Sequence, residues 1–234
     1  MSNKEIIVRI KEYLNKLDSA DYDNIECWQI MSAFNKAQLD FVRKQLSGYN
    51  LRRQGDEASK INIDDLEILL TTVDIDMEKK DRYYESIDTL PEDYNQFKRV
   101  KANSLMECCP KRPLKIHLEQ VADVEDMLVD EFKKPSIEWG ETFCTLQGNK
   151  IRIYTNNEFE IQEAKLVYYR NPKRVQHIEC FDLSLGETPT IEQECEFKDD
   201  IIEILLHDTA SILSGNIESL NQYNIQKTNV NERM

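Results

Sequence analysis

Three side chains in the C-terminal half have the residue types of an incomplete zinc site. His177 and Cys180 are separated by two residues, and Cys195 follows further along the chain. Structural zinc sites take four Cys or His ligands, usually including a C-x-x-C pair. Because only three ligands are within reach of one another and no C-x-x-C motif occurs, we predict no metal site and no cofactor. A metal-dependent enzyme that uses these three residues is the alternative.

The other residues capable of acid–base chemistry occur in patterns that favour structural roles. His117 and His207 lie within apolar helical patterns, so we interpret them as partly buried helix residues. Paired carboxylates are common in this acidic chain, and none has a spacing that specifies general acid–base catalysis. The pairs are Asp64-Asp65, Glu92-Asp93 and Asp199-Asp200. The sequence contains no Gly-rich phosphate loop. We therefore predict no catalytic residues and no enzymatic activity.

One cluster combines aromatic and basic side chains: Tyr168, Tyr169, Arg170, Lys173 and Arg174. Such a cluster could contact nucleic acid through phosphate pairing and base stacking. It could also be the end of a sheet with solvated charges, or a contact with an acidic neighbouring subunit. We favour these latter interpretations.

Composition excludes several classes of protein. The 234 residues include 30 Lys and Arg against 44 Asp and Glu, which gives a formal net charge of −14. General DNA-binding and membrane-surface proteins need a positive surface, so neither is expected. No apolar run reaches the length of a membrane span. We interpret all six cysteines as reduced thiols in a cytosolic setting; they are Cys27, Cys108, Cys109, Cys144, Cys180 and Cys195.

The β-prone centre of the chain positions the basic-aromatic cluster. Two runs are joined by Gly148-Asn149, a dipeptide that favours a tight hairpin because both residues adopt positive φ at low cost. A third run, 158–170, changes phase after Glu163 and ends before Pro172. The phase change predicts a bulge. We expect a three-stranded antiparallel meander, with the apolar helix 197–213 covering its apolar face.

Helices are expected on both sides of this β-rich portion. Ser2 and Glu5 form a capping box for a first helix, and a second helix is expected from Asp23 to Gly48. The sequence predicts an α+β fold in which N-terminal and C-terminal helices pack as a bundle, with an antiparallel β-rich portion inserted between them. The expected boundaries are 1–72 for the N-terminal helical part, 73–193 for the β-rich part with a loop at 108–113 and a helix near 118–131, 194–215 for the C-terminal helix, and 216–234 for an extended tail.

The tail is rich in Asn and Gln, with four apolar residues spaced along it: Ile217, Leu220, Tyr223 and Ile225. Such a segment has too little apolar surface to offset the entropy of ordering by itself. Its four apolar residues are therefore candidates to bind a partner.

An ordered set of motifs suggests a family. The turn Leu90-Pro91-Glu92-Asp93-Tyr94 is followed by a strand end at Leu166-Val167-Tyr168-Tyr169-Arg170-Asn171-Pro172. An acid-capped helix then begins at Glu196-Phe197-Lys198-Asp199-Asp200-Ile201-Ile202, before the Asn/Gln-rich tail. This order resembles the head–tail connector (adaptor, or tail-tubular protein A-like) family of short-tailed bacteriophages, most like the ring proteins below the portal in crAss-like phages. The chain departs from shorter members by extra residues between Met106 and Pro135.

The resemblance implies a structural virion protein that forms a homo-dodecameric ring beneath the portal. Such a ring extends the DNA channel, connects capsid to tail and contacts the portal protein and the next tail ring. It is assembled in the host cytoplasm and resides in the neck of the virion, where DNA passes without sequence-specific binding. The tail residues named above would reach the portal, and the basic-aromatic cluster would lie at a subunit interface or the channel. Acidic residues that could face the channel are Asp74, Asp76, Glu158 and Glu160.

Two further functions are compatible with the sequence. One is a lower tail ring or hub component. The other is a cytoplasmic adaptor that binds one protein partner and is absent from virions.

Overall fold

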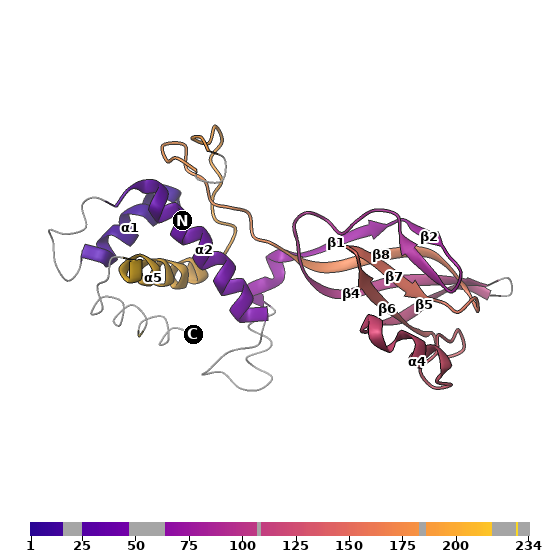
Figure 1. The fold of residues 1–234 in the computed structure, drawn as a ribbon. Helices are drawn as coiled ribbons and strands as arrows, with labels where there is room; N and C mark the ends of the chain where they lie inside the picture. The colour runs from indigo at the N-terminus through magenta and orange to yellow at the C-terminus, as the bar shows by residue number, and fades with distance from the viewer. Residues whose placement is uncertain (16–24, 47–63, 107–108, 183–185, 217–227, 229–234) are drawn as a thin grey trace. The chain divides into compact units, whose positions relative to one another are not determined.

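The computed structural model describes residues 1–15, 25–46, 64–106, 109–182, 186–216 and 228 (Figure 1). The chain divides into two compact units, Met1–Ile68 with Pro172–Met234, and Leu69–Asn171. We call them the helical unit and the sheet unit. The domain boundaries expected from the sequence stay a prediction, because compactness does not establish which parts fold independently. No helix in the described ranges combines the length and the apolar character needed to cross a membrane.

Three helices form the framework of the helical unit: α1 (Asn3–Asn15), α2 (Cys27–Leu46) and α5 (Asp199–Asn216). The predicted cap of α1 is confirmed, since the Glu5 N–H donates to the Ser2 hydroxyl at 3.3 Å. At the start of α2 the Glu26 N–H donates to the Gln29 side-chain oxygen at 3.0 Å. The expected ends of this helix, at residues 23 and 48, lie outside the described residues.

Both sides of α2 are buried, as its apolar pattern predicts. One side packs against α5, and just before that helix Phe197 meets Phe41 edge to face with ring centres 5.8 Å apart. The other side holds the segment that follows the sheet unit. There the buried Asn35 amide donates to the Val175 carbonyl at 3.0 Å and accepts from the Val175 N–H at 2.8 Å. These paired bonds satisfy backbone groups that would be costly to bury alone.

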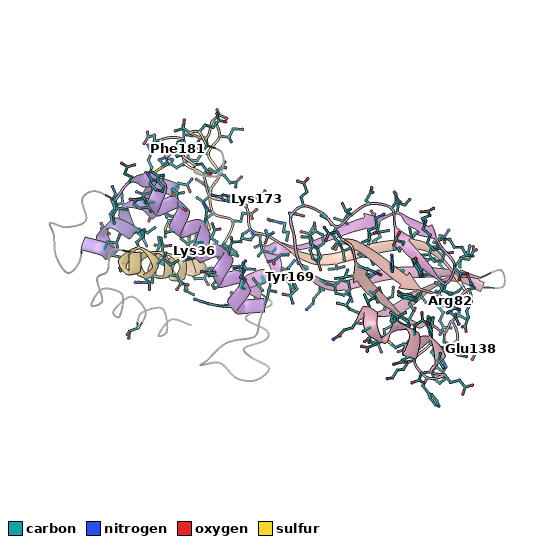
Figure 2. The ribbon with its side chains drawn as sticks, viewed as in Figure 1. Lys36, Arg82, Glu138, Tyr169, Lys173 and Phe181 are labelled. Atoms are coloured by element: carbon teal, nitrogen blue, oxygen red, sulfur yellow. A yellow bond between two sulfur atoms is a disulfide. The ribbon has the colours of Figure 1, made fainter. Side chains whose placement is uncertain are left out.

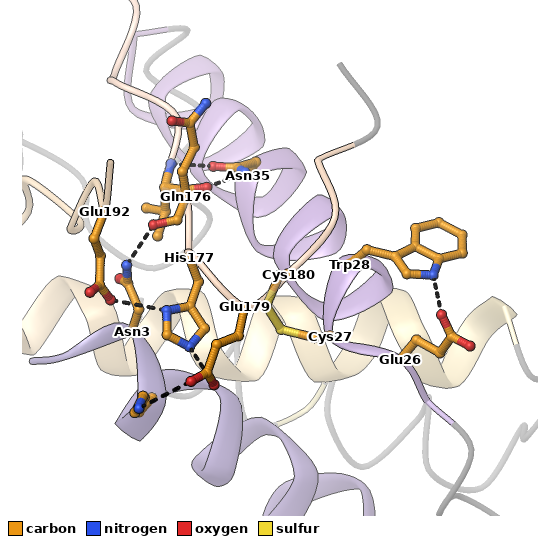
Figure 3. Close-up of a disulfide and its surroundings, with 12 residues drawn as sticks. Asn3, Glu26, Cys27, Trp28, Asn35, Gln176, His177, Glu179, Cys180 and Glu192 are labelled. Atoms are coloured by element: carbon orange, nitrogen blue, oxygen red, sulfur yellow. Dashed lines mark hydrogen bonds and ion pairs between the residues drawn. A yellow bond between two sulfur atoms is a disulfide. The ribbon is translucent and has the colours of Figure 1, made fainter. Parts of the chain in front are cut away.

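A disulfide between Cys27 and Cys180 fixes the same segment to the start of α2 (Figure 3). The interpretation of all six cysteines as reduced thiols is therefore wrong for these two. Pairing was not visible in the sequence because the two residues are separated by 153 positions, and only the packing of the segment on α2 brings them together. Cys144 and Cys195 are free thiols.

The sheet unit is built on one eight-stranded sheet with the order β1-β8-β4-β5-β6-β7-β3-β2. All neighbouring strands are antiparallel except β5 and β6, which are parallel. The strands are β1 Leu70–Ile75, β2 Met77–Lys79, β3 Tyr83–Ser86, β4 Tyr94–Met106, β5 Cys109–Leu118, β6 Glu141–Gln147, β7 Lys150–Tyr154 and β8 Glu160–Arg170. Its buried apolar cluster includes Leu166, Tyr168 and Ile153.

The predicted fold class is wrong. We expected N-terminal and C-terminal helices packed as a bundle around an inserted antiparallel β-rich portion. The structure instead has few helices and is dominated by a mixed, nearly closed, barrel-like sheet of eight strands. Hydrophobic periodicity indicates which face of a strand is buried. It does not indicate which strands pair, and the pairing decides whether a sheet is antiparallel or mixed. Nothing local in the sequence marks β5 and β6 as parallel partners.

The expected three-stranded meander is also wrong. The Gly148-Asn149 hairpin between β6 and β7 is confirmed, with φ of +60° and +59° at its two residues. However, β8 pairs with β1 and β4, while β7 pairs with β3. The predicted bulge is present: Asn103 pairs with Glu163 and Ser104 with Ile161, so Gln162 is the extra residue.

The helix expected over 197–213 is present as α5, but its expected role as the cover of the sheet is wrong. α5 packs against α2 and α1 within the helical unit. Its buried residues include Ile202, Leu205 and Leu206. An apolar helix face indicates that a partner exists, but does not indicate which apolar surface it covers.

The parallel β5–β6 pair requires a crossover connection, which is formed by residues 119–140. The crossover contains the 3-10 helix η2 (Val121–Asp123) and the short helix α4 (Val124–Val129), beside β6 in Figure 1. The expected single helix near 118–131 is therefore only partly present.

The expected loop at 108–113 is wrong where the structure describes it, because β5 begins at Cys109. Pro113 is tolerated there because β5 pairs with β6 only from Lys115 onward.

Replacing both disulfide cysteines, Cys27→Ser with Cys180→Ser, should lower the free energy of unfolding of the chain by about 2–4 kcal/mol under oxidising conditions. Urea unfolding followed by far-ultraviolet circular dichroism at a helix wavelength measures this loss. Dithiothreitol should produce the same loss in the wild type and no loss in the double variant. The matched control is Cys195→Ser, which keeps the wild-type response to dithiothreitol. A wild-type unfolding curve unchanged by the reductant would contradict the disulfide.

Candidate interaction surface

The crossover carries the most exposed large apolar side chains of the described chain. Phe132 is 98% exposed, Val129 83% and Trp139 80%. Figure 2 shows this part of the sheet unit around Glu138. Together with Lys133 and Lys134, these three side chains form what we call the crossover surface. Exposed apolar side chains grouped in this way are typical of contacts with another macromolecule.

The segment that carries Trp139 is anchored to β5. The Arg112 guanidinium on β5 donates to the Ile137 carbonyl at 2.7 Å and to the Glu138 carbonyl at 3.0 Å. The Lys115 N–H donates to the Gly140 carbonyl at 2.8 Å. Because Arg112 holds two consecutive carbonyls, the backbone next to Trp139 has a defined position.

Asp130 anchors the other half of the crossover surface. Its carboxylate accepts a hydrogen bond from the Phe132 N–H at 2.9 Å, and its carbonyl accepts one from the Lys134 N–H at 2.9 Å. Bonds of this kind between an Asp side chain and the backbone two residues on define a tight turn. The exposed ring of Phe132 therefore stands on a hydrogen-bonded turn.

An open hollow of about 710 Å³ lies between these two halves. Phe143 of β6 lines it and is itself buried, stacked on Tyr154 with ring centres 4.8 Å apart. Phe132 and Trp139 also line the hollow, as do the polar side chains of His117, Glu119, Asp123, Glu131, Glu141 and Ser136. The Lys115 ammonium lies 2.9 Å from the Glu141 carboxylate, and this hydrogen bond lowers the pKa of that carboxyl. The hollow can receive an apolar side chain within a polar rim.

The lysines of the sheet unit differ in whether a carboxylate pairs with them. Lys111 and Lys115 on β5 and Lys165 on β8 each form an ion pair with a carboxylate. In the part of the chain that the structure describes, neither Lys133 nor Lys134 has a carboxylate within 4.0 Å. They lie beside the exposed rings together with the exposed carboxylates of Glu131 and Glu138, so this part of the surface carries both charges.

The sequence-predicted basic-aromatic cluster is divided between the two units. Tyr168 and Tyr169 are buried in β8 of the sheet unit. Burial and a 2.8 Å hydrogen bond from the Tyr168 hydroxyl to the Asp93 carboxylate raise the pKa of Tyr168 to about 12. Arg170 is partly exposed and donates to the Asn171 carbonyl at 3.2 Å. Burial leaves little of either tyrosine ring available for stacking on a base.

The remaining two residues of the cluster belong to the helical unit, where each meets a carboxylate. Lys173 lies 3.4 Å from Glu196, and Arg174 lies 3.4 Å from Asp182. Both cations are thus already paired within the chain. The predicted role of all five residues at a subunit interface or the DNA channel stays a prediction.

Of the three residues considered for zinc, His177, Cys180 and Cys195, Cys180 forms the disulfide with Cys27 and so has no free thiolate for a metal. His177 is buried, with its Nδ1 3.1 Å from Glu192 and its Nε2 3.7 Å from Glu179. Burial raises the pKa of the Cys195 thiol to about 11. In the described ranges, no group of three His, Cys, Asp or Glu side chains could hold a metal ion.

The other candidate residues have structural surroundings. His207 lies buried in α5 and stacks on Tyr13 at 4.5 Å, as expected of a helix residue. The helical interpretation of His117 is wrong, because it lies in β5 and lines the hollow. Each of the three carboxylate pairs has a member with a partner: Asp64 pairs with Lys198 at 2.7 Å, Asp93 accepts from Tyr168, and Asp199 pairs with the N-terminal ammonium of Met1 at 3.0 Å.

The four acidic residues named as candidates for the channel are all exposed in the sheet unit. Asp74 forms an ion pair with Lys165 at 2.9 Å, and Glu160 forms one with Lys79 at 3.1 Å. The four apolar tail residues, Ile217, Leu220, Tyr223 and Ile225, lie outside the described residues.

Sequence reasoning did not single out the crossover surface. Phe132 and Trp139 belong to no helical or alternating pattern, and core prediction depends on such patterns. The available signal is the presence of two large aromatic residues in a polar stretch that contains Pro135 and Gly140. No protein-family model matches this chain, and a search of curated proteins finds no significant match.

Substitution of Gly140 tests how the backbone next to Trp139 is held. Gly140 has φ of +67°, and a Cβ added to it would lie 3.3 Å from Arg112 Nε. Gly148 is the matched control, with φ of +60° and no atom within 4 Å of an added Cβ. Replacing either glycine with Ala should lower the free energy of unfolding by about 1–2 kcal/mol, because a residue with a Cβ is strained in the left-handed backbone conformation. Gly140→Ala should cost about 0.5–1.5 kcal/mol more, because Arg112 must shift from its carbonyl partners. Urea unfolding measures both losses, and equal losses would contradict the Arg112 anchor.

Proposed function

We propose that this chain is a structural subunit of the neck of a short-tailed phage. In this proposal it forms a dodecameric ring beneath the portal, extends the DNA channel and connects capsid to tail. Its partners are other copies of itself, the portal protein and the next tail ring, and it performs no catalysis. The class of protein comes from the ordered motifs that resemble head–tail connectors.

The single structural observation that supports this proposal is the crossover surface. Phe132 and Trp139 are almost fully exposed on a segment whose backbone is held by hydrogen bonds to Arg112 and Asp130. Aromatic residues of this kind contribute strongly to binding when a partner buries them. A subunit that works within an assembly needs such surfaces, because weak contacts repeated around a ring add up to a stable complex.

The charge of the chain is consistent with the proposed channel. The net charge is −14, and the exposed acidic residues of the sheet unit include Asp76 and Glu158. Basic surfaces bind DNA by releasing counterions from its phosphates, whereas an acidic lining repels them. DNA could therefore slide through such a ring without being retained.

The proposal is tested by mass spectrometry of purified virions combined with chemical cross-linking. The expected result is that the chain is present in a copy number that matches a twelve-fold ring and is cross-linked to the portal protein. A chain present in virions but cross-linked only to tail proteins would identify a lower ring or hub component instead. Absence from virions would contradict the proposal and favour the cytoplasmic adaptor.

A further inference from the structure

The irregular segment between β8 and α5 is the part of the helical unit that the disulfide attaches to α2. We call its described residues, 172–182 and 186–198, the strap. Two backbone hydrogen bonds of 3.0 Å join Gln176 to Gln193 and divide the strap into two parts. The base is 172–177 with 193–198, and the outer arms are 178–182 with 186–192.

Buried side chains of both N-terminal helices hold the base of the strap. The amide of Asn3 in α1 is buried and donates to the Gln176 carbonyl at 2.9 Å and to the Gln193 carbonyl at 3.2 Å (Figure 3). On α2, Asn35 exchanges two hydrogen bonds with the backbone of Val175. None of these bonds involves a cysteine. The base therefore stays attached to the helices when the disulfide is reduced.

The outer arms are attached differently. The disulfide of Cys180 with Cys27 joins one arm to α2, and an ion pair of 3.7 Å joins Glu179 to Lys4 of α1. Both partners of that ion pair are largely exposed, so it contributes little to stability. On the other arm, Ile191 is 75% exposed and buries little apolar surface. The attachment of the outer arms to the helices therefore depends mainly on the disulfide.

The two sulfur atoms are placed for exchange with small thiols. Cys27 is partly exposed at the start of α2, whereas Cys180 is 3% exposed. A small thiolate attacks Sγ of Cys27, the S–S bond breaks, and Cys180 leaves as a thiolate that takes up a proton. A second small thiol then releases Cys27, so that one small-molecule disulfide and two protein thiols are formed. The reverse reaction, with a small-molecule disulfide as oxidant, closes the bond again.

We propose that the Cys27–Cys180 disulfide is a redox lock on the outer arms of the strap. In the reducing host cytoplasm the bond is open and the outer arms are released while the base stays attached. After the particle leaves the cell, oxidation closes the bond and fixes the outer arms on α2. The time of closure rests on the virion function proposed above, whereas the lock itself rests on the structure of the strap.

The fold allows the bond to close late, on an assembled subunit. Cys27 and Cys180 are separated by 153 positions, and their Cα atoms lie 5.4 Å apart. The buried bonds of the base bring the two residues together without help from the disulfide, so oxidation requires no refolding. Thiols are kept reduced in the cytosol, and disulfides form and persist in oxidising surroundings. A chain that is made in one setting and works in the other would change its oxidation state between them.

Amide hydrogen exchange of the full chain, measured by nuclear magnetic resonance with and without dithiothreitol, tests the lock. In the outer arms the Asp182 N–H donates to the Glu187 carbonyl at 3.0 Å, and in the base the Val175 N–H donates to Asn35. Reduction should speed exchange at Asp182 at least about tenfold by local opening and leave Val175 within about twofold. No change at Asp182 would overturn the lock, and so would an equal acceleration at Val175.

Two variants show that the effect of dithiothreitol comes from this disulfide. Cys27→Ser with Cys180→Ser should exchange rapidly at Asp182 whether or not the reductant is present. Cys195→Ser removes a thiol that is free in the structure and should respond to the reductant as the wild type does. A double variant that still responds to dithiothreitol would overturn the assignment of the lock to these two cysteines.

The time of closure is tested by differential alkylation. Infected cells before lysis, and purified virions, are quenched in acid and denatured. Free thiols are blocked with light iodoacetamide, and disulfides are then reduced and blocked with heavy iodoacetamide. Mass spectrometry should find Cys27 and Cys180 mainly light in cells and mainly heavy in virions, with the free thiols Cys144 and Cys195 light in both. A heavy label in cells, or a light label in virions, would overturn the proposed time of closure.

These results can be separated from the outcome of the virion experiment. A chain that is absent from virions would overturn the neck-ring function and the time of closure, while the exchange rates still decide whether the lock exists. A chain present in virions, with exchange at Asp182 unchanged by reduction, would support the function and overturn the lock.

Discussion

The parallel pairing of β5 with β6 is the constraint on which the sheet unit depends. Antiparallel neighbours can be joined by a short turn, but parallel neighbours need a connection that returns the chain to the same end of the sheet. Residues 119–140 make that return. The connection therefore cannot be shortened to a turn, and the same residues carry Phe132, Trp139 and the hollow between them. In this chain the topology of the sheet creates the surface that we propose to be functional.

The helical unit uses different interactions to hold the strap. The segment after the sheet unit has little regular structure, and its backbone groups need partners. The Asn35 amide supplies partners for Val175, and the Cys27–Cys180 disulfide adds a covalent tie. The strap is thus fixed to α2 by side chains and not by a sheet ladder. The crossover surface and the strap both consist of irregular segments held on regular elements, which is where functional residues are often found.

Local features of the fold could be predicted from the sequence, because they depend on a few neighbouring residues. The Ser2 cap, the Gly148-Asn149 hairpin and the bulge near Glu163 each follow from the chemistry of a short stretch. Strand pairing could not be predicted in the same way. β8 pairs with β1 and β4 although β7 precedes it directly, and the sequence gives no local signal for that choice. The disulfide was missed for the same reason, since it depends on tertiary packing.

The candidate surface escaped prediction because its residues do not form a pattern. Tyr168 and Tyr169 were predicted to be candidate interaction residues because they neighbour basic residues, yet both are buried in the sheet unit. Phe132 and Trp139 are isolated in the sequence and exposed in the structure. A cluster of residue types therefore indicated the core of the sheet, whereas the exposed aromatic residues could be recognised only from their accessibility.

Hydroxyl-radical footprinting of virions and of the isolated chain would test most directly whether a partner in the virion covers the crossover surface. Oxidation of Phe132 and Trp139 is compared with that of Ile87, another exposed apolar residue of the sheet unit. The account predicts that oxidation of Phe132 and Trp139 falls severalfold in the assembled particle relative to Ile87, because a partner buries their rings. Equal oxidation of Phe132 and Trp139 in the particle and in the isolated chain would contradict the account.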